Sequence, residues 1–261
     1  MPDSRYSAGR VLVALLALSL GACAQPGDTA NAPDPFEGPN RAVHSFNKGL
    51  DRTVVKPASE AYVRVVPRPV RGGVSNGVNT LSQPIYAANH VLQGDFLGAV
   101  HTAFRFGTNV FVGFAGIADP ATQMGLYDRP TDFGETLAVW GVDSGPYVEL
   151  PFFGPSTVRD TTGLVVDFVA DPYALTLLRD YTGWFIALEA ADALQQRNEY
   201  SRLIEALLYE SADSYNAARI AYLQNRAATI GGSAGGDGAT PATGDLEDPY
   251  AFDLEDPYAT E

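Results

Sequence analysis

The sequence predicts a mostly α-helical single domain with few or no strands, followed by a disordered acidic C-terminal tail. Apolar residues recur three or four positions apart in several segments, which is the spacing of one face of a helix. Prolines stand at the start of many of these segments, where a helix tolerates them. Hydrophobic residues make up 46% of the 261 residues, enough for one sizeable folded domain.

The first 22 residues are typical of a secretory signal peptide. Arg5 and Arg10 precede the apolar run Val11–Leu20, which is too short to span a bilayer. Cys23 is the only cysteine, and Leu20-Gly21-Ala22-Cys23 resembles the bacterial lipobox, in which the cysteine is acylated and becomes the new N-terminus. The alternative is an ordinary signal peptide with an incidental cysteine.

An acylated Cys23 would anchor the chain to a membrane, because several acyl chains together make release negligible. In Gram-negative lipoproteins an aspartate after the cysteine usually signals retention in the inner membrane. This chain has Ala24 there, so the resemblance points to the outer membrane. Residues 23–35 are then expected to be a polar linker, and residues 36–230 the folded domain.

The domain is expected to begin with a helix that Asp34 caps and Pro35 opens. Three further helices are expected to open at prolines, and these are Pro57, Pro69 and Pro84. Gln93-Gly94-Asp95 ends the last of them, and Asp95 can cap the next helix, which is expected over Phe96–Val112.

The second half alternates loops and helices. Asp119–Pro155 is rich in glycine and proline and is expected to form loops with one short strand, "PYVELPFF". Helical spacing resumes at Ser156–Val169 and Pro172–Leu178. The longest helix is expected over Asn198–Thr229.

Charge is unevenly distributed. The formal net charge is −14, and residues 231–261 carry eight acidic residues and no basic ones, so the body still carries about −7. No basic stripe is visible, which excludes nucleic acid as a partner, and an acidic body is expected to gain nothing from anionic lipid surfaces. The tail contains a tandem repeat, "DLEDPYA", at Asp245–Ala251 and Asp253–Ala259. It is expected to be a solvated tail or a short motif whose Tyr250 and Tyr258 dock on a basic partner.

Five blocks of sequence resemble the MlaA family, also called VacJ, in order and spacing from about Asp34 to Arg226. They are "DPFEGPNRAVHSFN", "VPRPVRGGVSN", "LQGDF", "FRFGTNVFVGFAGIADPA" and "DFGETLAVWGVDSGPYVELPFFGPSTVRDTTG". The resemblance implies a ring-like, multi-helix lipoprotein in the inner leaflet of the outer membrane, with a central amphipathic channel. It also implies removal of misplaced phospholipid from the outer leaflet. A soluble periplasmic carrier of the MlaC type would receive that phospholipid, and trimeric porins are the expected membrane partners.

Candidate functional residues are polar groups inside apolar or glycine-rich blocks. Arg105 and Asn109 lie one helical turn apart among phenylalanines, so they are expected to brace a loop or to line a path for lipid headgroups. Gln93, Gly94 and Asp95 form a candidate hinge that could gate the channel, or merely a turn. The apolar run Val110–Ala118 is expected to be a buried core segment or a piece that dips into one leaflet.

An enzymatic function has little support in the sequence. Gly73-Val74-Ser75-Asn76-Gly77 fits the G-x-S-x-G pattern of a lipase nucleophile, but the preceding "VVPRPVR" does not resemble the strand that this motif requires. The three histidines show no metal-ligand spacing, and no phosphate-binding glycine loop is present. We therefore expect no catalytic activity, no metal and no cofactor, and a phospholipase or a structural scaffold for porins stays as the alternative.

Overall fold

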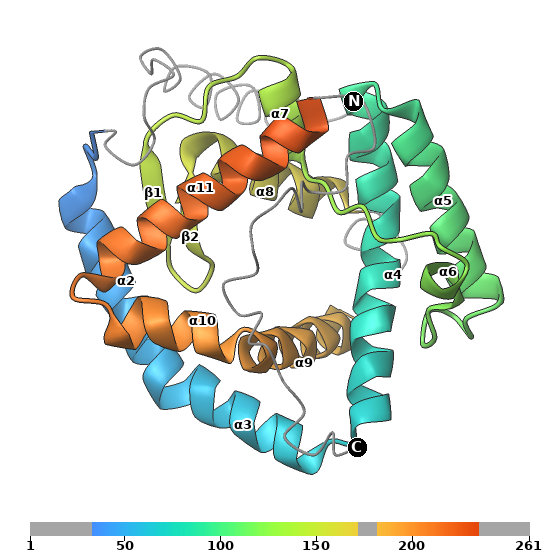
Figure 1. Ribbon diagram of the computed structural model, residues 1–261, viewed down its shortest axis with the longest axis horizontal. Coiled ribbons are helices and arrows are strands. Elements are labelled where there is room, and N and C mark those ends of the chain that lie inside the picture. Colours follow the sequence, from blue (N-terminus) through green and yellow to red (C-terminus); the bar gives the residue numbers. More distant parts are fainter. Residues whose placement is uncertain (1–32, 172–181, 235–261) are drawn as a thin grey trace, which may run out of the picture.

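The computed structural model describes residues 33–171 and 182–234. Its helices follow one another around a ring (Figure 1). The first half comprises α2 (Glu37–Leu50), the π-helical segment η1 (Asp51–Val55), α3 (Lys56–Val65), α4 (Arg68–Gln93), α5 (Phe96–Phe111) and α6 (Pro120–Gln123). The second half comprises α7 (Phe133–Val139), β1 (Tyr147–Leu150), β2 (Gly154–Thr157), α8 (Val158–Ala170), α9 (Thr182–Glu199), α10 (Ser201–Glu205), the π-helical segment η3 (Ala206–Glu210) and α11 (Ser214–Ala234).

Three helices form successive sides of the ring, and the later elements complete it. Figure 1 shows α2, α3 and α4 along the circumference, with α9 packed against α3 and α4. Helix α5 packs along the side of α4 away from the ring centre, and α7, α8 and α11 lie at the opposite end from α3. The described part of the chain therefore has the mostly helical, ring-like architecture expected from the sequence.

Prolines and caps place several helices as predicted. Pro57 and Pro69 stand in the first turns of α3 and α4. At Pro69, which follows the extended Pro67, a missing N–H costs nothing, whereas α3 continues from η1 without a break. Asp95 caps α5 by accepting a hydrogen bond from the Gly98 N–H at 2.8 Å. The expected helix over Ser156–Val169 is present as α8, and Thr157 caps it by accepting from the Asp160 N–H.

Three expected boundaries are wrong. The first helix begins at Glu37, because the Asp34 carboxylate bonds to the Phe36 N–H and holds a turn before the helix. Pro84 does not open a helix but lies inside the continuous helix α4. The last expected helix is interrupted, since η3 ends in an extended residue, Ser211, before α11 begins.

The glycine-rich middle of the chain is more ordered than expected. It forms the short helices α6 and α7 and a two-stranded antiparallel hairpin in which Tyr147 pairs with Thr157 and Leu150 with Gly154. The expected helix Pro172–Leu178 lies outside the described residues. Among the described residues, no helix combines the length and the hydrophobicity that crossing a membrane requires.

The interior of the ring wall is polar. Within the described ranges, 21 polar or charged residues are buried, against six apolar ones: Val78, Ala99, Ala121, Tyr147, Tyr215 and Ala218. The same ranges expose 29 large hydrophobic side chains. A water-soluble domain of this size buries mainly its apolar side chains, so the burial pattern is that of a protein in contact with an apolar surrounding.

Candidate functional site

Helix α5 shows the inverted burial pattern most clearly. Its inner face, which packs on α4, is built from small and polar residues, and the outer face is apolar and exposed. The buried residues are Gly98, Ala99, Thr102, Arg105 and Asn109. The outer residues are 62–87% exposed, and they are Phe96, Leu97, Val100, Phe104 and Phe111. Each set recurs at helical spacing, so the two faces are properties of the sequence as well as of the fold.

The loop after α5 extends this apolar surface. Phe111, Phe114 and Ile117 are 87%, 81% and 63% exposed, so the expectation that Val110–Ala118 is a buried core segment is wrong. A hydrogen bond from α4 helps to hold the loop in place, because the Asn76 side chain donates to the Ile117 carbonyl at 3.0 Å. Gly116 has φ +88°, and a Cβ there would lie 2.8 Å from Thr80, so only glycine fits this close approach to α4.

Arg105 and Asn109 brace the other end of that loop. Both side chains are buried, and both donate to Asp119, at 2.7 Å and 3.0 Å. Arg105 also donates to the Leu126 carbonyl and to Thr122 Oγ1. Burial alone would raise the pKa of Asp119, but the hydrogen bonds from Thr122, Arg105 and Asn109 outweigh it and lower that pKa.

These contacts are those of the loop-bracing alternative for Arg105 and Asn109. Only a few per cent of the surface of each residue is exposed, so a ligand could reach little of either side chain. Their role in a headgroup path stays a prediction.

The candidate hinge is a tight turn between α4 and α5. Gly94 has φ +80°, and Gln93 donates to Thr131 Oγ1 and Thr136 Oγ1 at 2.7 and 3.1 Å. Its gating role stays a prediction.

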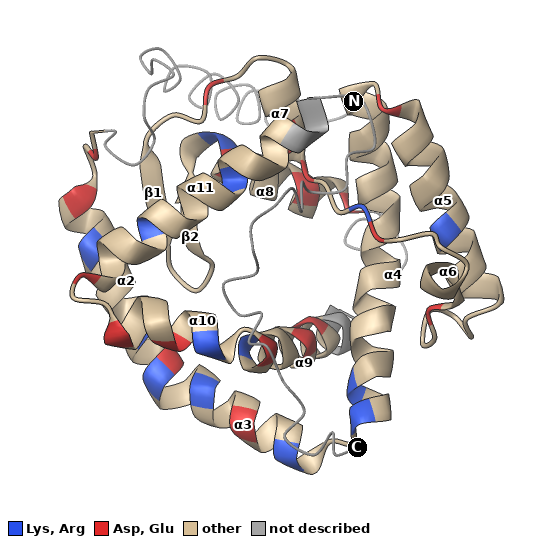
Figure 2. Cartoon of the chain, viewed as in Figure 1, with Lys and Arg blue, Asp and Glu red and all other residues tan. Residues whose placement is uncertain are grey.

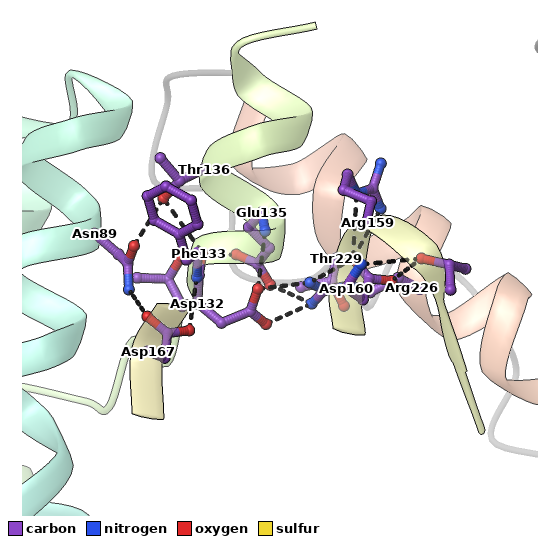
Figure 3. A network of polar contacts seen from close by, with 12 residues as sticks. Asn89, Asp132, Phe133, Glu135, Thr136, Arg159, Asp160, Asp167, Arg226 and Thr229 are labelled. Carbon is purple, nitrogen blue, oxygen red and sulfur yellow. Dashed lines mark hydrogen bonds and ion pairs between the residues drawn. The ribbon is translucent and has the colours of Figure 1, made fainter. Parts of the chain in front are cut away.

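A second polar network joins the last helix to α7 and α8 (Figure 3). Arg226 Nη2 lies 2.6 Å from Asp132 and 3.1 Å from Asp160, and Arg226 Nη1 lies 3.0 Å from Glu135. Asp160 also accepts from the Tyr222 hydroxyl at 2.7 Å. Burial would raise the pKa of Asp160, but the charge of Arg226 and the bond from Tyr222 lower it. This network ties the last helix to the segment of α7 and α8 in the middle of the chain.

Sequence reasoning missed most of this network. Arg159 and Asp160 brace the start of α8, since Arg159 Nη2 lies 3.1 Å from Asp160 and the Asp160 N–H bonds to Thr157 Oγ1. The role of Arg226 was missed, because its partners lie 66 to 94 residues away in the chain. The only available signal was an arginine in the last helix facing an acidic "DFGE" block.

A third buried cluster joins α2, the hairpin and α11. His44 Nδ1 lies 3.0 Å from Glu149 Oε1, and His44 Nε2 lies 3.0 Å from Ser214 Oγ. Lys48 Nζ donates to the same serine hydroxyl at 3.2 Å. A cavity of about 330 Å³ opens beside this cluster, and its apolar end is lined by Leu50, Phe152, Phe153, Ile204 and Leu208.

Comparison with known proteins identifies the family of the chain. Residues 32–229 match the family model described as MlaA lipoprotein, which covers most of the chain. The chain belongs to the MlaA lipoprotein family. The resemblance read from the five sequence blocks is therefore confirmed.

Relatives and a solved structure support the same membership of the MlaA family. Over 224 residues the chain is 37% identical to the intermembrane phospholipid transport system lipoprotein MlaA of Escherichia coli, covering 80% of this chain and 86% of that protein. It is 32% identical over 231 residues to the protein of the same name from Haemophilus influenzae, covering 82% and 88%. A solved chain from work on the structural basis for maintenance of bacterial outer membrane lipid asymmetry matches with a TM-score of 0.65 and 30% identity, covering 76% of this chain and all of that one.

The motif and metal predictions can be placed within this MlaA fold. Gly73–Gly77 lies in the interior of α4, so Ser75 does not stand on the strand-to-helix turn that a nucleophile elbow requires. No group of three or more potential metal ligands occurs among the residues that the structure describes. Cys23 lies outside them, and its acylation stays a prediction.

Proposed function

We propose that this protein is an outer-membrane lipoprotein that removes mislocalised phospholipids from the outer leaflet and passes them to a periplasmic carrier. Membership of the MlaA family supports this proposal, as do relatives named as intermembrane phospholipid transport lipoproteins. Transport of this kind maintains the lipid asymmetry of the outer membrane, the subject of the work on the similar solved chain.

The observation that carries the proposal is the inverted burial of the ring. Transfer of a two-chain phospholipid into water would cost on the order of 25 kcal/mol, at about 0.8 kcal/mol per CH₂. A passive protein must therefore keep the acyl chains in hydrocarbon while the headgroup crosses a polar path. The exposed apolar face of α5 and its loop fits the first requirement, and the central amphipathic channel that the family resemblance implies would supply the second.

The anchor determines the location of the ring, and a partner must determine the direction of transport because the sequence contains no phosphate-binding glycine loop. Acylated Cys23, followed by the linker of residues 23–35, would hold the ring in the inner leaflet on the periplasmic side. A periplasmic carrier of the MlaC type would give the process its direction, and a trimeric porin would position the ring. The gate in this scheme is the α4–α5 turn at Gln93–Asp95.

The test uses an Escherichia coli strain without its own MlaA protein. Expression of this chain should lower the amount of phospholipid that an added phospholipase can reach on intact cells. A Phe111→Asp, Phe114→Asp variant should fail to do so although it accumulates normally. If the chain associates with porin but leaves surface phospholipid unchanged, the scaffold alternative is correct and the transport proposal fails.

A second candidate function has one observation in its favour. Glu149, His44 and Ser214 form a hydrogen-bonded line in the order of an esterase triad, with both distances at 3.0 Å. The surroundings argue against it, because the Asn216 N–H bonds to Asp213 Oδ1, and the carboxylate of Asp213 would repel an oxyanion. Retained transport in a Ser214→Ala variant, and no labelling of the wild-type protein by a fluorophosphonate probe, would exclude this activity.

A further inference from the structure

Four exposed arginines of the described chain have no ion pair or side-chain hydrogen bond, and three of them lie on the same side of the ring: Arg52, Arg64 and Arg68, with Arg202 of α10 as the fourth. Residues 48–71 contain six basic and two acidic residues, although the body as a whole is acidic. Figure 2 shows this excess of Lys and Arg over α3 and the start of α4. We define the basic corner as the side of the ring from η1 along α3 to the start of α4. It comprises Arg52, Arg64 and Arg68 together with three valines of the same segment, Val54, Val65 and Val70.

The arginines of the basic corner differ from most of the others. Arg105, Arg159 and Arg226 are bound by carboxylates of this chain. Arg52, Arg64 and Arg68 are exposed and have no ion pair or hydrogen bond with any residue that the structure describes. Placing three free guanidinium groups on one corner of an acidic protein leaves them available for an anionic ligand.

The valines restrict what that ligand can be. Val54, Val65 and Val70 are 54%, 77% and 55% exposed, and each lies within two residues of a free arginine. A small soluble anion such as inorganic phosphate would neutralise the arginines but would leave the valines in water. The surface of a leaflet accommodates both, because valine enters the acyl region while arginine extends to the phosphates.

The corner is also rigid. Val66 and Pro67 have extended backbones between α3 and α4, and the buried Arg71 side chain donates to the Val66 carbonyl at 3.1 Å. The same arginine bonds to Gln195 of α9. The free arginines are therefore presented on a fixed frame, and binding does not require a segment to become ordered.

We propose that the basic corner binds the headgroups of anionic phospholipids and gives the ring a preference for them over zwitterionic ones. The inference rests on the proposed function, since it needs the ring in a lipid leaflet. It refines the expectation from net charge, because the −7 of the body is an average that this corner does not share. Each arginine at a membrane surface should contribute about fivefold to binding.

The experiment uses the acylated mature protein in nanodiscs of equal phosphatidylglycerol and phosphatidylcholine with matched acyl chains. Lipids retained after gentle extraction are counted by native mass spectrometry. Wild-type protein should retain phosphatidylglycerol in at least fivefold excess, and the excess should fall as salt is raised, because exposed charges are screened. The triple variant Arg52→Gln, Arg64→Gln, Arg68→Gln should retain both lipids equally.

Three controls separate the possible outcomes. The triple Arg→Lys variant should keep the preference. Arg202→Gln removes one charge from an exposed arginine of α10 that also has no ion pair, outside the corner, and should change the preference less than twofold. Unfolding temperatures should be unchanged, because the corner arginines are exposed and form no ion pair or hydrogen bond within the described chain.

The results also distinguish this inference from the function on which it rests. If the wild-type protein retains neither lipid, the proposed function fails. If it retains both equally, or if the triple variant keeps the excess, only the anionic preference is overturned. A preference that appears only when the chain ends at Ala234 would show that the acidic tail occupies the corner, which would also overturn the proposal.

Discussion

The phenylalanines after α5 allow a quantitative test of the apolar outer surface. Phe111 and Phe114 are 87% and 81% exposed, so both side chains should enter hydrocarbon when the ring is in a leaflet. Burying a phenylalanine side chain contributes about 2 kcal/mol. Replacing both by serine should therefore weaken membrane binding by about 3 kcal/mol, which is roughly a hundredfold.

The assay must isolate the folded surface from the acyl anchor. A chain that begins at Ala24 lacks Cys23, and its partition into phosphatidylcholine vesicles can be followed by flotation. The Phe111→Leu, Phe114→Leu variant is the matched control, since leucine preserves the apolar area and should partition nearly as well as the wild type. In solution the serine variant should unfold at the same denaturant concentration as the wild type, because exposed side chains contribute little to stability.

Two results would refute this reasoning. An unchanged partition coefficient in the serine variant would mean that the loop stays in water when the protein binds. A large loss of folding stability in the same variant would mean that these side chains pack against protein, contrary to their exposure.

Three further predictions concern the ring wall. Arg226→Met should destabilise the fold by about 3–5 kcal/mol in denaturant titration, because it leaves the carboxylate of Asp160 and its neighbours buried without a cation. Folding lowers the pKa of Asp160 from 3.8, so its ionised form stabilises the protein above that pH. This stability should be lost as the pH falls below about 4. The Asp160→Asn variant should therefore show a flatter acid limb in its pH–stability curve. Gly163→Ala should destabilise by about 1–3 kcal/mol, since its Cβ would lie 2.3 Å from the Gly134 nitrogen, whereas Gly72→Ala in α4 meets nothing within 4 Å and should be neutral or stabilising in thermal melts.

Local signals predicted the helix starts well. Pro57, Pro69 and Asp95 act on the backbone of their own turn, so their effect can be read without knowing the rest of the fold. At Pro84 the same local rule predicts a helix start, but α4 continues through this residue. A proline inside a helix loses one backbone hydrogen bond and crowds the carbonyl four residues earlier. Helix α4 stays continuous because α5 packs along it, and the sequence around Pro84 contains no trace of that partner.

The buried networks could not be predicted for a related reason. Arg226 meets Asp132 and His44 meets Glu149 only after the ring has closed, and the partners are 94 and 105 residues apart in the chain. A cation and a carboxylate at such separations could pair with many others. The five family blocks identified the right segments, but the pairings within them come from the fold.

The sequence of α5 itself indicates which of its two faces is buried, although this is harder to infer than the helix boundaries. Periodicity shows that a helix has two faces but does not say which of them faces solvent. In α5 the polar face carries Thr102, Arg105 and Asn109, spaced by three and four residues, between the phenylalanines. A charged arginine inside an otherwise apolar helix is stable only if it faces bonding partners, and then the apolar face must find a non-aqueous surrounding. The stripe of polar residues therefore predicts both the buried Asp119 contact and the exposed apolar surface, which makes α5 the element that connects the sequence to the proposed transport of phospholipid.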